Sequence, residues 1–177
     1  IPISAQVILL TLAPLAGISE RRSDRLVTPL TTEALPPFLS PHGGVHSGYM
    51  IAQYVAAALA AELRTLAMPA SAESVPTSGL QEDYNSMAAG SALKARRAAG
   101  LARQVLAVEA LLAAQALDFR APLAPGRGSA AARDAVRTRV PRLDTDRYLK
   151  ADLDAALALC EADTIVAAVE RVIGPLQ

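Results

Sequence analysis

The residues with the clearest capacity for chemistry are Gln81, Glu82 and Asp83, near the end of a stretch without helical or strand periodicity. Structureless segments longer than ~12–15 residues are uncommon inside compact domains and often carry function, and this one covers residues 68–84. A carboxylate placed there can accept a hydrogen bond from a substrate or handle a proton. A long apolar segment follows, so the alternative is capping of its helix by Asp83 or Asn85.

Other reactive side chains form no convincing site. His42 and His46 lie in a glycine-containing loop, and with a single cysteine in the chain they are too few for a zinc site. Cys160 lies in an apolar segment, which predicts a small buried side chain rather than a nucleophile. The stretch Gly126-Arg127-Gly128 is too short for a phosphate-binding loop. The sequence therefore predicts no metal site in this chain.

Two basic clusters are expected to form solvated helix faces or, for the second cluster, an interface in an assembly. They comprise Arg21, Arg22 and Arg25, and then Lys94, Arg96, Arg97 and Arg103. The chain carries 17 basic and 17 acidic residues, so its formal net charge is zero. This balance provides no electrostatic footprint for nucleic acid or for an anionic membrane.

The composition favours a helical bundle that packs against other chains. The sequence is 52% hydrophobic but only 3% aromatic, because much of the apolar content is alanine, which forms helices well and lets them approach closely. The mean hydropathy of +0.28 is high for a small monomeric domain, which predicts apolar surface buried against partners. A single cysteine cannot form an internal disulfide and indicates a reducing, cytoplasmic setting.

Hydrophobic periodicity and proline or glycine punctuation predict an all-α chain. The expected helices cover residues 4–26, 48–67, 85–119, 129–139, 146–158 and 162–173. Pro14 is expected to kink the first helix, and a run of prolines that starts at Pro29 excludes a helix from the following loop. Residues 1–120 are predicted to form the core bundle of one domain, with short surface helices in residues 121–177.

The longest predicted helix carries the spacing of a bundle seam. The seam residues are Leu101, Val105, Val108, Leu112 and Gln115. At the other end of the chain, the charge-free residues 1–17 are too short to span a membrane, which takes ~20 apolar residues. We therefore expect no membrane segment. Because the chain begins with Ile1 rather than methionine, we expect it to belong to a longer or processed protein.

Several motifs, in order along the chain, resemble those of aromatic amino acid ammonia-lyases of the histidine ammonia-lyase type. The resemblance extends over essentially the whole sequence, and it rests on the order and spacing of the motifs together rather than on any one of them. The matching stretches are Ile18-Ser19-Glu20-Arg21-Arg22, His46-Ser47-Gly48-Tyr49-Met50, Met68-Pro69-Ala70-Ser71, Val75-Pro76-Thr77-Ser78, Gln81-Glu82-Asp83, Leu111-Leu112-Ala113-Ala114-Gln115 and Asp146-Arg147-Tyr148-Leu149.

This resemblance implies a fold, a reaction and partners. It implies a long-helix bundle of the ammonia-lyase and fumarase-like type with a small helical C-terminal cap, assembled as a homotetramer or as a tetramer of fragment pairs. Such enzymes eliminate ammonia from an aromatic L-amino acid by means of a methylidene-imidazolone electrophile formed from an Ala-Ser-Gly triplet. The present sequence contains no such triplet, so the resemblance implies that an N-terminal portion supplies it and that this chain is inactive alone.

The resemblance assigns catalysis and substrate binding to Glu82, with Gln81 as a second substrate-binding residue. A glutamate at this position favours histidine, since related phenylalanine and tyrosine enzymes commonly have glutamine there. Tyr84 and Asn85 replace the His-Val pair common in histidine lyases. The alternatives are therefore a tyrosine or phenylalanine ammonia-lyase, a 2,3-aminomutase of the same family, and a non-catalytic helical interaction module.

Overall fold

The computed structural model describes residues 2–28, 35–70, 72 and 74–176, and this part of the chain is helical without strands. Pro29 and Ser71, used in the sequence interpretation, lie outside the described residues. The predicted all-α fold is confirmed. Its helices are α1 (Pro2–Val27), α2 (Met50–Leu66), α3 (Ala88–Phe119), α4 (Arg127–Arg137), α5 (Lys150–Glu161) and α6 (Thr164–Ile173), with two short 3-10 turns, η1 (Pro37–Leu39) and η2 (Ser78–Leu80).

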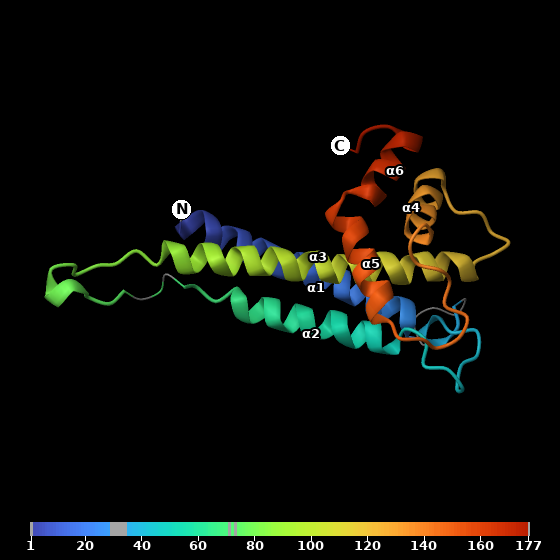
Figure 1. The fold of residues 1–177 in the computed structure, drawn as a ribbon, viewed down its shortest axis with the longest axis horizontal. Helices are drawn as coiled ribbons and strands as arrows, with labels where there is room; N and C mark the ends of the chain where they lie inside the picture. Colours follow the sequence, from blue (N-terminus) through green and yellow to red (C-terminus); the bar gives the residue numbers. More distant parts are fainter. Residues whose placement is uncertain (1, 29–34, 71, 73, 177) are drawn as a thin grey trace.

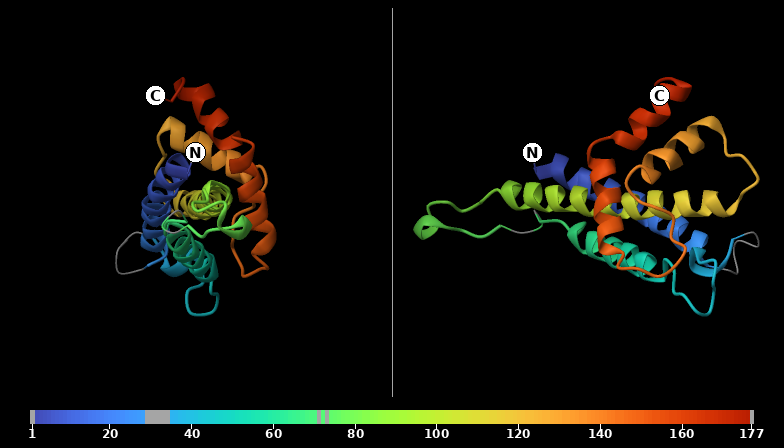
Figure 2. Two further views of the ribbon diagram at one scale, coloured as in Figure 1. Left: turned by 90° about the vertical axis from the view of Figure 1, so that its left-hand side faces the viewer. Right: turned by 45° about the vertical axis from the view of Figure 1, so that its right-hand side comes forward.

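The three long helices form the body of the molecule (Figure 1). Helix α2 runs antiparallel to α1, and α3 then returns alongside both of them. The C-terminal helices lie against one side of this body, where α5 crosses α3 and α4 packs against both α3 and α6 (Figure 2). Short helices therefore cover part of the long bundle, as the sequence predicted for its C-terminal portion.

The predicted seam of α3 is the centre of the core. All five of its residues are buried, and Val105, Leu112 and Gln115 are completely inaccessible to solvent. Helix α2 meets this seam through Ala52, Ala56 and Ala60, which repeat every four residues on its buried face. Small side chains at that spacing let two helix backbones approach closely, which explains why so much alanine supports a stable bundle.

Helix α1 continues without a break through Pro14. Proline removes one backbone donor but has a φ angle that a helix accepts. The helix is held on both sides of this position, because Leu9 and Ala16 are buried in the same apolar cluster. Packing along the helix therefore offsets the lost hydrogen bond.

Helices α2 and α5 both begin later than the sequence predicted, at Met50 and Lys150. The reason is a contact between their two leading segments. The carboxylate of Asp146 accepts hydrogen bonds from the backbone N–H groups of Ser47 and Gly48, each at 2.8 Å. Gly48 has a φ of +53°, and a Cβ there would lie 2.5 Å from the carbonyl oxygen of Phe38, so only glycine fits.

Helix α3 is long and apolar enough to cross a membrane by length and composition alone. However, 56% of its most apolar window is buried inside the molecule. Helices α1, α2, α4 and α5 all pack against it. Its apolar character thus serves the central position that it occupies in the bundle.

Candidate functional site

Gln81 and Glu82 lie at the tip of an arm that connects α2 to α3. We call residues 74–87 the arm; it extends beyond the ends of both helices (Figure 1). Its tip closes on itself, because the backbone N–H of Thr77 donates to the carbonyl of Glu82 at 2.9 Å and the N–H of Glu82 donates back at 3.3 Å. This pair of hydrogen bonds fixes the start and the end of a tight reversal.

The reversal between Thr77 and Glu82 uses an unusual backbone. Ser78, Gly79 and Leu80 have φ angles of 55°, 64° and 71°, in the left-handed region. Glycine adopts this region freely, but serine and leucine do so at a cost of about 1 kcal/mol or more each. Strain of this kind is concentrated at functional sites, where surrounding contacts maintain it. The tip therefore has a defined conformation rather than that of an ordinary loop.

The Glu82 carboxylate is held within the arm by neighbouring side chains. The hydroxyl of Thr77 donates to Oε2 of Glu82 at 3.0 Å, and Nδ2 of Asn85 donates to the same hydroxyl oxygen at 2.9 Å. Ser74 binds both backbone groups of Asn85, accepting from its N–H at 2.7 Å and donating to its carbonyl at 3.0 Å. The carboxylate is thus oriented although it lies on the surface.

Gln81 and Glu82 are exposed to solvent in this chain. Apolar side chains beside them are exposed as well, with 79% of Leu80 and 78% of Tyr84 accessible. The hollow between α2, α3 and α5, about 190 Å³ in volume, is lined by other residues, among them Val55, Leu59 and Gln104. A substrate pocket around Glu82 would therefore need walls from outside this arm.

The prediction that Asp83 or Asn85 caps α3 is wrong. The helix begins at Ala88 after Met87, which makes no side-chain capping bond. Asn85 cannot cap it, because its side chain donates to Thr77 and, at 2.7 Å, to the carbonyl of Val75. The polar residues before α3 organise the arm instead of the helix terminus.

Both basic clusters are exposed but engaged in ion pairs, which modifies the expectation of simple solvated faces. Arg21 forms two hydrogen bonds with the buried carboxylate of Glu20, at 2.6 and 2.7 Å. Arg22 pairs with Glu109 of α3. In the second cluster Arg97 pairs with Glu62 of α2. The Arg22 and Arg97 pairs join long helices to one another, whereas the Arg21 pair lies within α1. Nothing in these pairs indicates catalysis.

The histidines and the cysteine also remain outside the candidate site. The rings of His42 and His46 lie 5.6 Å apart, and Nδ1 of His46 is 3.8 Å from the carboxylate of Asp146. Cys160 is half-buried, and burial raises the pKa of its thiol, which disfavours the nucleophilic thiolate. Across the described ranges, no group of three or more His, Cys, Asp and Glu side chains is placed to hold a metal ion.

Comparison with known proteins decides the family. A model of the aromatic amino acid lyase family, described as "Aromatic amino acid lyase", matches residues 2–138. The chain belongs to this family. The matched region contains the three long helices and the entire arm with Gln81 and Glu82.

Curated relatives of this family member include bacterial histidine ammonia-lyases. The chain is 47% identical to histidine ammonia-lyase of Myxococcus xanthus over 96% of its own length and 33% of the relative. It is 45% identical to that of Symbiobacterium thermophilum over 100% of its length and 35% of the relative. The chain therefore spans about a third of the length of these relatives.

Solved structures share the helical arrangement. Histidine ammonia-lyase from Trypanosoma cruzi superposes with a TM-score of 0.92 at 34% identity, covering 97% of this chain and 34% of that one. Tyrosine aminomutase from Streptomyces globisporus gives the same TM-score at 36% identity, covering 97% and 33%. The predicted ammonia-lyase type of fold is confirmed. The names of the two neighbours describe different reactions.

The sequence pointed to the loop and to Glu82 as a candidate, but not to Thr77, which binds the Glu82 carboxylate, or to Asn85, which binds Thr77. A signal was present at Asn85, which stands where the resembling lyases commonly have valine. A polar residue in place of an apolar one, beside a candidate carboxylate, points to a new contact. The reversal that brings Thr77 back to Glu82 could not be read from the residue order.

Proposed function

We propose that this chain is part of an ammonia-lyase that eliminates ammonia from an aromatic L-amino acid, with histidine as the substrate and urocanate as the product. Support comes from family membership and from curated histidine ammonia-lyases that are 43–48% identical to the chain. The site residue is Glu82, with Gln81 beside it. The setting we propose is the cytoplasm.

The observation that carries this proposal is the oriented carboxylate of Glu82 at an exposed tip. Oε2 is bound by Thr77, and among the described residues Oε1 has no partner and can face a substrate. A carboxylate accepts a hydrogen bond from an imidazole N–H or from an ammonium group, both of which histidine offers. Charge-assisted bonds of this kind are stronger than neutral ones, so the contact can contribute to recognition and to proton handling.

The remaining parts of the site would come from other segments. The sequence contains no Ala-Ser-Gly triplet, so the methylidene-imidazolone group of the proposed mechanism must be formed in an N-terminal portion of the enzyme. That group supplies the electrophile of the elimination. This chain contributes the Glu82 carboxylate, carried by the arm into a pocket built with other subunits of a homotetramer, or of a tetramer of fragment pairs, and it is inactive alone.

A second candidate is a tyrosine or phenylalanine lyase or a 2,3-aminomutase. It is favoured by the aminomutase neighbour with a TM-score of 0.92 and by Tyr84-Asn85 after the Gln-Glu-Asp motif. Both candidates use the same fold, so the fold does not separate them. The histidine lyase ranks first because Glu82 matches the polar imidazole better than it matches an apolar or phenolic ring.

Product analysis of the assembled enzyme tests the proposal. The enzyme is incubated separately with L-histidine, L-tyrosine and L-phenylalanine, and ammonia and organic products are identified by mass spectrometry. We expect ammonia and urocanate from histidine, with kcat/KM at least about 100-fold above the other two, since a site built for a hydrogen-bonding group rejects analogues that lack it. A β-amino acid without net ammonia release would establish the aminomutase, and no turnover of any substrate would support a non-catalytic module.

A further inference from the structure

We propose that Asn85, acting through the hydroxyl of Thr77, is a positioning residue that fixes the Glu82 carboxylate for the substrate. The inference rests on the proposed function of Glu82 and adds two residues to it. Its basis is a chain of hydrogen bonds, from Nδ2 of Asn85 to Oγ1 of Thr77 at 2.9 Å and from that hydroxyl to Oε2 of Glu82 at 3.0 Å.

The direction of these hydrogen bonds follows from the chemistry of the groups. Nδ2 of Asn85 lies 2.7 Å from the carbonyl oxygen of Val75, which can only accept. The nitrogen, not the oxygen, of the amide must therefore face this side. Its two hydrogens are both committed, one to Val75 and one to Thr77, so Asn85 acts as a donor toward Thr77.

The hydroxyl of Thr77 then remains free to donate one hydrogen bond. Its hydroxyl has a single hydrogen, and because its oxygen accepts from Asn85 this hydrogen can point to Oε2 of Glu82. The two backbone hydrogen bonds between Thr77 and Glu82 hold the residues at a fixed separation. The carboxylate is therefore oriented by its own backbone pairing and by a hydroxyl whose direction is set by Asn85.

Asn85 is itself anchored. Both of its backbone polar groups bind the side chain of Ser74, and its side chain spans Val75 and Thr77. The residue thus connects the outgoing and returning halves of the arm. A valine at this position could make none of the side-chain bonds, so Glu82 would depend on Thr77 alone.

The functional consequence is preorganisation. An exposed glutamate samples many rotamers, and ordering its side chain costs about 1.5–2 kcal/mol of conformational entropy. An arm that orders the carboxylate before the substrate arrives avoids this cost during binding and in the transition state. It also leaves Oε1 as the atom directed toward the substrate, which gives the site one defined acceptor.

The test compares Thr77→Val, Thr77→Ser and Asn85→Val in the assembled enzyme, both alone and combined with Glu82→Gln. For each variant kcat and KM for histidine and the Kd of urocanate are measured. Thr77→Val keeps the shape and the backbone pairing but removes the hydroxyl, so we expect about a tenfold loss of kcat/KM, the usual effect of one hydrogen bond to a charged group. Thr77→Ser should recover most of this loss.

The combined variants separate positioning from a structural role. With Glu82→Gln already present, Thr77→Val and Asn85→Val should have less than about a twofold further effect, because residues that act through one group are not additive. An equal further loss in that background would overturn the proposal. Full activity of Thr77→Val and Asn85→Val, with Glu82→Gln impaired, would overturn it while leaving the proposed function intact. An unimpaired Glu82→Gln would refute the proposed role of Glu82, on which this inference rests, while the product analysis above still tests the reaction itself.

Discussion

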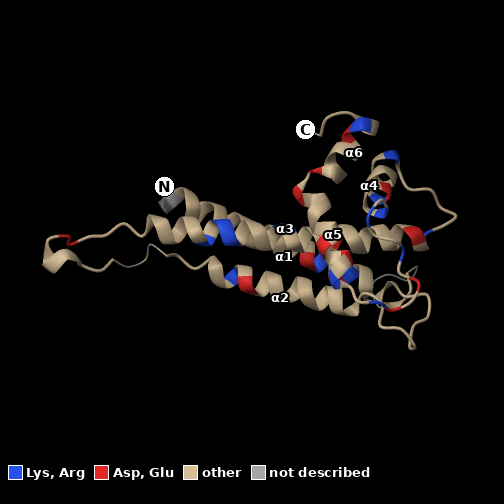
Figure 3. Cartoon of the chain, in the orientation of Figure 1, with Lys and Arg blue, Asp and Glu red and all other residues tan. Residues whose placement is uncertain are grey.

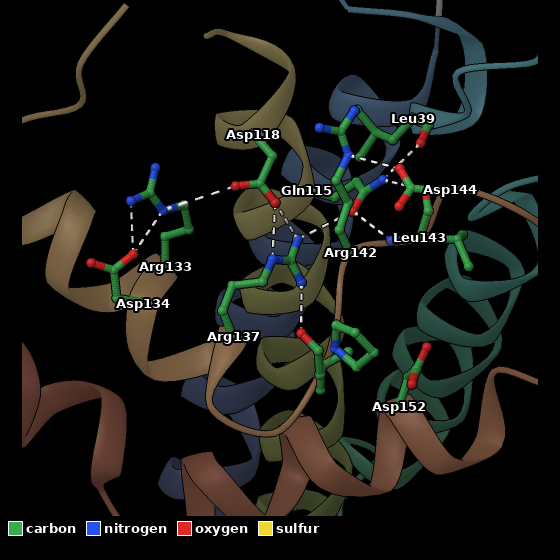
Figure 4. Close-up of polar contacts among 12 residues, drawn as sticks. Leu39, Gln115, Asp118, Arg133, Asp134, Arg137, Arg142, Leu143, Asp144 and Asp152 are labelled. Carbon is green, nitrogen blue, oxygen red and sulfur yellow. Dashed lines mark hydrogen bonds and ion pairs between the residues drawn. The ribbon is translucent and has the colours of Figure 1, made fainter. Parts of the chain in front are cut away.

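Gln115 joins several parts of the fold. Its completely buried amide makes four hydrogen bonds, donating to the carbonyls of Leu39 and Leu143 and accepting from the N–H of Leu143 and from Arg137 (Figure 4). Arg137 also pairs with Asp118 at 2.8 Å. Helix α3, helix α4, η1 and the segment before α5 are therefore connected through one side chain.

Replacing Gln115 by leucine should destabilise the assembled enzyme strongly. The substitution keeps the volume but leaves buried carbonyls and an N–H unpaired, at a cost of about 2–4 kcal/mol. The measurement is the midpoint of thermal unfolding followed by circular dichroism. Gln104→Leu on the same helix is the matched control, because Gln104 lines an apolar hollow and should tolerate leucine. Equal midpoints for the two variants would contradict this role of Gln115.

The burial of Gln115 could be predicted from the sequence, but its hydrogen-bonding partners could not. The periodicity of α3 placed Gln115 on the buried seam, because that position depends only on local helical geometry. Its partners could not be predicted, since Arg137 and Leu143 follow 22 and 28 residues later. Likewise, Glu82 could be chosen by its motif, whereas its contact with Thr77 depends on a backbone reversal with positive φ angles.

At the scale of elements, the segment that leads into α2 is held by a residue far away in the sequence. Tyr49 at the N-terminus of α2 makes no side-chain capping bond. The carboxylate of Asp146 accepts from the backbone N–H groups of Ser47 and Gly48, which precede the helix and lie 99 and 98 residues away in the sequence. The backbone hydrogen bond from Ser47 is the main cause that lowers the pKa of the Asp146 carboxyl below its ordinary value of 3.8, with Gly48 and His46 adding to the effect.

Asp146→Asn should therefore lower the thermal stability of the enzyme in a pH-dependent manner. The folded-state pKa of Asp146 is lowered, so its contribution is fully present above 3.8 and is lost as the pH falls from there through the lower folded-state value. The thermal midpoints of Asp146→Asn and of the parent enzyme should differ at pH 7 and converge below about pH 4. Asp144→Asn, two residues before Asp146 in the same segment, is the control. A constant difference between Asp146→Asn and the parent across this range would contradict the assignment.

Helix types and order were predictable, but several helix boundaries were not. The apolar periodicity and the prolines locate all six α-helices, because these signals are local. The later starts of α2 and α5 accompany a contact that crosses the fold, between Asp146 and the Ser47 segment. The later start of α3 accompanies a contact within the arm, between Asn85 and Thr77. Asn85, a polar residue shortly before a helix, is a candidate cap from the sequence. In the structure its side chain donates to Val75 and Thr77 instead.

At the scale of the whole molecule, a large apolar surface remains uncovered in the single chain. On α1, Val7, Ile8, Leu15 and Ile18 are each between 47% and 60% accessible. Figure 3 shows no charged residue along the N-terminal part of this helix. Exposed contiguous apolar faces mark interaction sites, so we infer that other helices of the assembled enzyme cover α1, in agreement with the high mean hydropathy of the sequence.

Leu15→Asp should disrupt the assembly. A charge buried without a partner in a helical interface costs about 3–5 kcal/mol, and sedimentation velocity should show smaller species and lost activity. Leu123→Asp provides the control, because Leu123 is 62% accessible in the connection between α3 and α4 and lies away from that face. An unchanged sedimentation coefficient for Leu15→Asp would mean that α1 faces solvent in the native enzyme.

Steady-state kinetics of Glu82→Ala in the assembled enzyme show whether this chain supplies a substrate-facing carboxylate to a lyase site. With histidine as the substrate we predict a loss of kcat/KM of about 100-fold, because one charge-assisted contact at a reacting site has that weight. Glu161→Ala, an exposed glutamate at the end of α5, should retain parental kinetics. Parental turnover by Glu82→Ala would contradict the account.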